Sequence, residues 1–158
     1  MSADVFTTVI GQPTVVGALR RAVAAAAAIV AGDPVPPGEM THAWLFTGPP
    51  GSGRSVAARA FAAALQCRDG GCGHCTACHT TLTGTNADVR LVVPDGLTIG
   101  VGEMRALVLR AASAPSGGRW QVVLVEDADR LTEAASNALL KAVEEPPERT
   151  VFLLCAPS

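Results

Sequence analysis

The stretch that decides the fold is "HAWLFTGPPGSGRSVAARAFAAALQC", residues 42–67. It opens with an apolar run, 42–48, that predicts a short buried strand, and it closes with 54–67, which predicts a helix. The glycine-rich turn between them matches the phosphate-binding loop G-x-x-x-x-G-K-[ST] except at one position, where Arg54 replaces lysine. Strand, glycine-rich turn and helix form the context that this loop requires.

The rest of the chain alternates between helices and strands. Helices are predicted at 14–32, 102–113 and 132–145, and further strands at 88–94, 120–127 and 150–156. The run 120–127 is mainly apolar and ends in two acids, which is typical of a central parallel strand covered on both faces. The alternation predicts one α/β domain over residues 1–158, with a mostly parallel, doubly wound sheet flanked by helices.

The glycine-rich turn is the first candidate site, because successive backbone N–H groups and a helix N-terminus can hold phosphate there. Ser55 has the hydroxyl that would ligate Mg²⁺, whereas the longer, forked side chain of Arg54 cannot occupy the position of a lysine ammonium. The alternative is a tight strand-to-helix turn with no ligand. The candidate nucleotide-binding residues here are Gly48, Pro49, Pro50, Gly51, Ser52, Gly53, Arg54, Ser55 and Val56. ATP and Mg²⁺ are the ligands the motif implies, and the sequence leaves open whether they still bind.

Glu126 and Asp127 end the strand 120–127 and complete the candidate nucleotide site. In P-loop ATPases of this type, an Asp near Mg²⁺ precedes a Glu near the attacking water. Here the order is reversed, and misplacements of about an ångström cost on the order of 10²-fold in rate. The alternative is an ordinary charged strand end that meets solvent. Together with Arg54, the reversal predicts a weak or absent ATPase and no catalytic residue.

Four cysteines form C-x4-C-x2-C-x2-C within residues 67–78: Cys67, Cys72, Cys75 and Cys78. Four thiolates satisfy tetrahedral Zn²⁺ in a closed structural site, so we expect a small zinc module inserted in the domain. The rivals are a redox dithiol in "CGHC" and an iron–sulfur cluster, whose usual spacings differ. His74 and His79 are expected to be exposed neighbours, and Cys155 a small core residue.

The composition limits the class of protein. The net charge is −2, which disfavours a free-standing nucleic-acid binder, including a zinc-based one. The start of the chain lacks the features of a signal peptide, and the apolar run 22–31 is about half the roughly 20 residues that a membrane span needs. We therefore expect a cytoplasmic protein without membrane contact. Because the chain stops directly after a core strand, we also expect an N-terminal fragment of a longer protein.

The zinc cysteines after a P-loop helix, the acid-tipped strand, "SNALLKAVEEPPERTVFLL" (136–154) and "VIGQ" (9–12) together resemble bacterial DNA polymerase III clamp-loader subunits. The resemblance covers nearly the whole chain and implies an AAA+ domain. With "GRS" and "ED" in place of "GKT" and "DE", the sequence is more similar to the delta-prime type than to the gamma/tau motor type. It also implies lid and collar domains and an arginine-finger motif beyond this segment.

The resemblance implies further roles for individual residues. Val9, Ile10 and Gln12 would approach an adenine, and Glu126 and Asp127 would stand at the metal. The helix with Lys141 would neighbour DNA in the assembled ring, although a solvated lysine is an equally good interpretation. Leu139, Leu140 and Val143 are expected in the core by their helical spacing.

The implied function is that of a structural clamp-loader subunit within the DNA polymerase III holoenzyme. Its partners would be the gamma/tau and delta subunits, the sliding clamp and primed DNA. The alternative is a gamma/tau-like subunit with an active ATPase.

Overall fold

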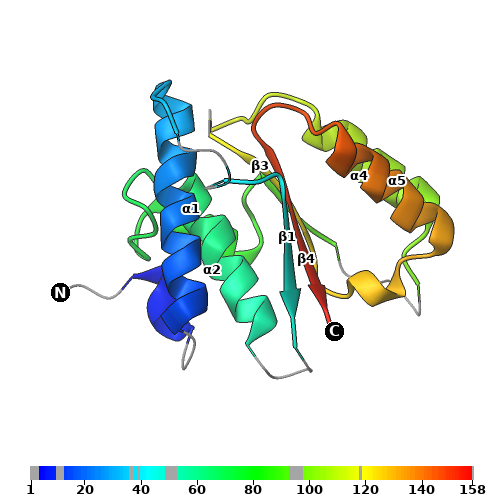
Figure 1. Cartoon of the computed structure of the whole chain (residues 1–158), viewed down its shortest axis with the longest axis horizontal. Coiled ribbons are helices and arrows are strands. Elements are labelled where there is room, and N and C mark those ends of the chain that lie inside the picture. Colours follow the sequence, from blue (N-terminus) through cyan, green and yellow to red (C-terminus); the bar gives the residue numbers. More distant parts are fainter. Residues whose placement is uncertain are drawn as a thin grey trace.

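A four-stranded parallel sheet is the centre of the computed structural model, with strands in the order β1-β4-β3-β2. Figure 1 shows β1 and β4 side by side. The structure describes residues 4–9, 13–35, 38, 40–48, 53–92, 98–117 and 119–157. Helices cover both faces of the sheet, α1 and α2 on one and α4 and α5 on the other. The α/β fold with a parallel sheet, expected from the alternation of elements, is confirmed.

The elements follow the predicted order closely. The helices are α1 (Pro13–Ala31), α2 (Arg54–Gln66), α3 (Thr76–Thr83), α4 (Val101–Ala111) and α5 (Glu133–Glu144), with 3-10 turns η1 (Val5–Thr8) and η2 (Ala128–Arg130). The strands are β1 (Ala43–Thr47), β2 (Val89–Val92), β3 (Gln121–Val125) and β4 (Thr150–Ala156). Helix α3 and the turns η1 and η2 were not predicted from the sequence.

Alternate residues of the central strands supply two cores. On β3, Val122 and Leu124 pack toward α1 and α2, and Val123 and Val125 pack toward α4 and α5. All five residues of β3 are buried, as expected for a strand covered on both faces. The parallel register brings the carboxyl ends of β1, β3 and β4 to one edge of the sheet, where ligands bind in open α/β sheets.

At two positions the sequence predicted a buried apolar side chain, and the structure shows an exposed one. Leu140 was expected in the core, yet 58% of its surface is exposed, because α5 turns this position away from the sheet. Leu45 was placed in a buried strand, but β1 pairs only with β4 among the described residues, and Leu45 is 63% exposed. In contrast, Leu139 is buried and Val143 packs against the same core, as expected.

The alanine-rich helix α1 is long and apolar enough, by length and composition alone, to cross a membrane. In the structure it lies beside α2 (Figure 1), and it buries Leu19, Ala22 and Ala26 in the core that α2 shares. Its small side chains allow the two helices to approach closely. The packing agrees with the expectation that this run is a helix of the folded domain.

Candidate functional site

The structure describes the two ends of the glycine-rich turn, Gly48 after β1 and Gly53 before α2. The Gly48 N–H donates to the carbonyl of Ala156 over 3.2 Å, so the end of β1 is tied to the end of β4. Gly53 precedes the helix with φ 90°, a left-handed conformation that favours glycine. Its carbonyl accepts the first helical bond, from Ala57 N–H at 2.9 Å. The predicted residues Ile10, Gln12, Pro49, Pro50, Gly51 and Ser52 lie outside the described residues.

Arg54 folds back onto its own loop. Its Nη1 donates to the carbonyl oxygen of Gly48 at 2.7 Å, and its Nη2 lies 3.7 Å from Oδ1 of Asp127. Only 10% of the Arg54 side chain is exposed, so these contacts are largely shielded from water. The guanidinium is therefore committed to two groups of the protein at the position where a working loop has a phosphate-binding lysine.

Glu126 receives three hydrogen bonds on one carboxylate oxygen. Ser55 Oγ donates to Oε1 at 2.8 Å, and Arg59 donates to the same oxygen through Nε at 2.9 Å and Nη2 at 2.5 Å. The Glu126 side chain is 20% exposed and that of Arg59 39%, so the ion pair is partly buried. Ser55 and Arg59 are four residues apart on α2 and so share one helical face. Arg59 was not among the predicted site residues, although its spacing of four residues from Ser55 could have indicated it.

The structure thus brings Ser55, Glu126, Arg54 and Asp127 together, as the sequence predicted for a P-loop site. In this arrangement each of the two acids is paired with an arginine, and Arg54 also donates to the loop backbone. The remaining described positions are peripheral: Val9 is buried in the core shared by α1 and α2, and Val56 is 42% exposed.

The four predicted metal-ligating cysteines form a second cluster. Cys67 follows α2, Cys75 caps the N-terminus of α3, Cys78 lies within α3, and Cys72 lies in the loop between the helices. Their sulfur atoms all lie within 4.8 Å of one another. The Sγ atoms of Cys67 and Cys75 are 3.7 Å apart, close to the edge of about 3.8 Å in a tetrahedron with Zn–S bonds of about 2.3 Å. The cluster could therefore hold a metal ion.

Backbone amides point at the sulfur atoms, which is the environment that thiolates need. Asp69 and Cys72 N–H groups donate to Cys67 Sγ at 3.3 and 3.4 Å, and Gly73 N–H donates to Cys78 Sγ at 3.4 Å. Burial raises the pKa of Cys67, but the hydrogen bonds from the amides outweigh it and bring the pKa down to about 7. Burial raises the pKa of Cys78, with the neighbouring thiols adding to the rise.

Glycines shape the chain around the sulfur atoms. Gly71 has φ 106°, and a Cβ added there would lie 2.6 Å from the side chain of Val5, so this position requires glycine. His74 and His79 are exposed and stand outside the four-sulfur cluster, as expected. Cys155 is fully buried beneath α2, in agreement with its interpretation as a core residue.

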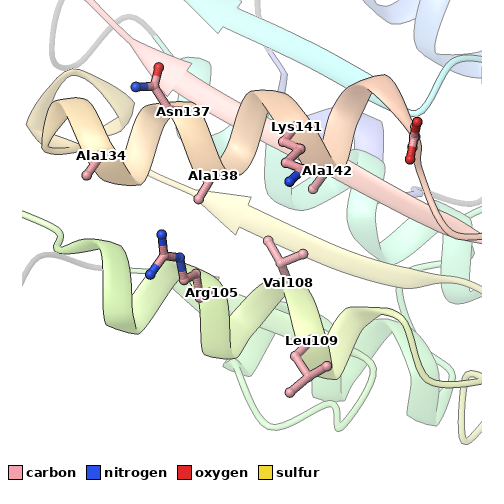
Figure 2. Close-up of a pocket in the computed structure, with 9 residues that line it drawn as sticks. Arg105, Val108, Leu109, Ala134, Asn137, Ala138, Lys141 and Ala142 are labelled. Carbon is pink, nitrogen blue, oxygen red and sulfur yellow. The ribbon is translucent and has the colours of Figure 1, made fainter.

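A groove of about 580 Å³ runs between α4 and α5 (Figure 2). It lies on the opposite face of the sheet from the cysteines. Its apolar lining includes Val108 and Ala138, and Leu109 at its rim is 75% exposed. Arg105 on α4 and Lys141 on α5 add cationic side chains. Lys141, which the resemblance placed near DNA, is thus exposed and lines an open surface.

Comparisons with known proteins all find similarity to subunits of DNA polymerase III. The family described as "DNA polymerase III, delta subunit" matches residues 33–158. The chain is 41% identical over 123 residues to the DNA polymerase III subunit delta' of Pseudomonas aeruginosa, covering 73% of this chain and 37% of that protein. It is 39% identical over 121 residues to the subunit gamma/tau of Mycobacterium tuberculosis, covering 73% of this chain and 21% of that one.

A solved structure shows the same fold. The gamma subunit-related protein of Thermotoga maritima superposes with a TM-score of 0.53 at 22% identity, over 86% of this chain and 39% of that chain. The chain spans only about a fifth to two fifths of the length of the curated relatives reported above.

Proposed function

The chain belongs to the DNA polymerase III delta-subunit family, a family of clamp-loader subunits, and from this premise we propose that it serves as a structural subunit of the delta-prime type. Residues 1–158 would be the nucleotide-binding-type domain of a longer AAA+ subunit, with lid and collar domains in the remainder. In a clamp loader such a subunit is a stator: it holds the geometry of the assembly while its neighbours hydrolyse ATP.

The observation that carries this proposal is the engagement of Arg54. The residue that stands at the lysine position donates to Gly48 and pairs with Asp127, so its charge is directed at the protein. The reversed acids Glu126 and Asp127 displace each carboxylate by about a methylene from its working place. The loop and the strand end thus both differ from a working P-loop site, and both differences favour a degenerate ATP site.

Zinc is the metal that best suits the four-cysteine cluster. Thiolates are soft ligands, a set of four leaves no open position for chemistry, and the 3.7 Å sulfur separation fits Zn–S geometry. A bound ion would tie the end of α2 to α3, and its role would be structural. Metal analysis of the purified protein should find about one zinc ion per chain.

The partners proposed from the family are the gamma/tau and delta subunits, with the sliding clamp and primed DNA contacted through the assembly. The groove between α4 and α5, with Arg105 and Lys141 on its walls, is a candidate surface for such contacts (Figure 2). The relatives are DNA replication proteins, and we propose a cytoplasmic location for this one.

The test is reconstitution of the complete subunit with its partners. We expect the subunit to co-purify with gamma/tau and delta, to hydrolyse no ATP alone, and to be required for the ATPase of the assembly. An Arg54→Ala variant is compared with the unsubstituted subunit after its folding has been verified, because Arg54 also contacts Gly48 and Asp127. The proposal would be overturned if the isolated subunit hydrolysed ATP and the Arg54→Ala substitution abolished that activity.

A catalytically active gamma/tau-like subunit is the second candidate, because gamma/tau proteins match the chain at 36–39% identity. The two candidates differ in nucleotide binding. An active subunit would gain about 2.7 kcal/mol of stability at 100 times its Kd for Mg·ATP. We expect no upward shift in melting temperature with Mg·ATP, and a clear shift would favour the second candidate.

A further inference from the structure

The contacts of Arg59 indicate how the negative charge of Glu126 is balanced in this site. Two nitrogens of the guanidinium converge on Oε1 of Glu126, the same oxygen that accepts the Ser55 hydroxyl. In a working P-loop, the Ser/Thr hydroxyl and the acid at the strand end are both turned toward Mg²⁺. The guanidinium therefore lies beside Ser55 and Glu126, the two side chains that would otherwise ligate a divalent cation.

We propose that Arg59 is a built-in cation of this site, which takes the place of a divalent metal at Glu126 and holds Ser55 and Glu126 together without metal or nucleotide. This inference rests on the proposed function, because it takes the loop at 48–56 for a degenerate nucleotide site. It adds a residue and a mechanism: the site is closed by a side chain of α2 itself.

Geometry explains why Arg59 reaches the acid. Residues 55 and 59 lie one turn apart on α2, and side chains on a helix point toward its N-terminus, which faces the end of β3. The long side chain of Arg59 can therefore extend past Ser55 to Glu126. The forked guanidinium places two donors, Nε and Nη2, on the same carboxylate oxygen.

The charges of the four central side chains already balance. Arg54 faces Asp127 and Arg59 faces Glu126, so two cations accompany two anions in a partly buried space. A divalent cation brought to Glu126 would meet the Arg59 guanidinium within a few ångströms, where repulsion between partly shielded charges is strong. The Ser55 contact alone would leave room for a metal, since a hydroxyl that donates its proton keeps its lone pairs. Arg59 is the group that excludes it.

Manganese binding tests this inference without ATP. Mn²⁺ shares the oxygen preference of Mg²⁺ and can be followed by electron paramagnetic resonance, with zinc kept saturating so that the cysteines are occupied. We expect Arg59→Gln to bind one Mn²⁺ per chain at least tenfold more tightly than the unsubstituted chain. Adding Glu126→Gln should remove that gain, and Arg59→Lys, which keeps a cation, should show none.

A gain of less than tenfold in Arg59→Gln, or a gain that survives Glu126→Gln, would overturn the inference. Far-UV circular dichroism checks the fold, and Arg59→Met, which keeps the aliphatic stem, is the substitute if the glutamine variant does not fold. A failure of this inference can be distinguished from a failure of the proposed function. ATP hydrolysis by the isolated subunit would refute the stator, whereas an inert subunit whose Arg59→Gln variant gains no Mn²⁺ would refute only the role of Arg59.

Discussion

Arg54 shows how a side chain at the lysine position of the P-loop pattern can contact groups of the protein itself. A lysine at this position has a single ammonium group, which can point at a phosphate. The arginine instead spreads its donors between the Gly48 carbonyl and the Asp127 carboxylate. It therefore acts as an internal brace between the start of α2, the loop and the end of β3.

If Arg54 is a brace, its removal should cost stability. A hydrogen bond from a charged donor to a shielded carbonyl contributes about 1.5–3 kcal/mol, so we expect Arg54→Ala to lower the free energy of unfolding by about that amount. Urea denaturation measures the change. Arg68→Ala, at an exposed position, is the matched control and should change it by less than about 0.5 kcal/mol. Equal effects of the two substitutions would show that Arg54 does not brace the loop.

The five cysteines should divide into two classes by reactivity. Burial, followed by the nearby negative charge of Glu126, raises the pKa of Cys155 to about 11, so almost no thiolate forms there at pH 8. In the zinc-loaded protein we expect no rapid reaction with a thiol reagent at pH 8. After chelation four thiols should react, and the fifth only in denaturant. Cys155→Ala should leave the native count unchanged, and fast modification of Cys155 in the native protein would contradict the assignment.

At the level of single residues, the sequence predicted the members of both sites better than it predicted their contacts. Strand ends and motif spacing suffice to bring Ser55 near Glu126 and to gather the four cysteines. The partner of a long side chain depends on tertiary geometry, so Arg59 was missed. Leu140 was misplaced because helical spacing shows that a face is apolar but not how wide the buried part of that face is.

Among the elements, those with strong periodicity were predicted well and the short polar ones were missed. The apolar run of β3 and the amphipathic pattern of α5 are visible in the sequence. Helix α3 has the sequence TACHTTLT, rich in threonine and weak in helix propensity. Its N-terminus is capped by the Cys75 sulfur, and it packs against α2. Its stability therefore depends on contacts that propensity alone does not report.

The cap of α5 offers a test at this scale. Thr132 precedes the helix, and its hydroxyl oxygen accepts a hydrogen bond from the Ala135 N–H at 3.1 Å. Loss of such a cap costs about 1 kcal/mol, so we expect Thr132→Ala to lower the free energy of unfolding by that amount. Thr132→Ser keeps the hydroxyl and should behave nearly as the parent does. A serine variant as unstable as the alanine variant would show that the threonine methyl group, and not the cap, is responsible.

Across the whole molecule, the two hydrophobic cores are built from different parts of the chain. The core on the α1–α2 face includes Cys67 and Cys78, and η1 is bound to the cysteine loop by a hydrogen bond from Val5 N–H to the Gly71 carbonyl at 3.0 Å. The core on the α4–α5 face contains none of the four clustered cysteines. A metal at the cluster would therefore stabilise one side of the sheet more than the other.

Hydrogen exchange before and after chelation tests this asymmetry. Metal binding to a cluster that the unfolded chain cannot form is linked to folding, so its removal should loosen what the cluster holds. We expect amides in 67–84 to exchange at least tenfold faster after chelation, with a smaller change in η1 and almost none in β3 and α5. Cys72→Ser should reproduce the pattern without chelator and show no further change with it. If exchange instead rises equally in β3 and in 67–84, the metal supports the entire domain as one cooperative unit, and if it rises nowhere, the cluster contributes no stability to the fold.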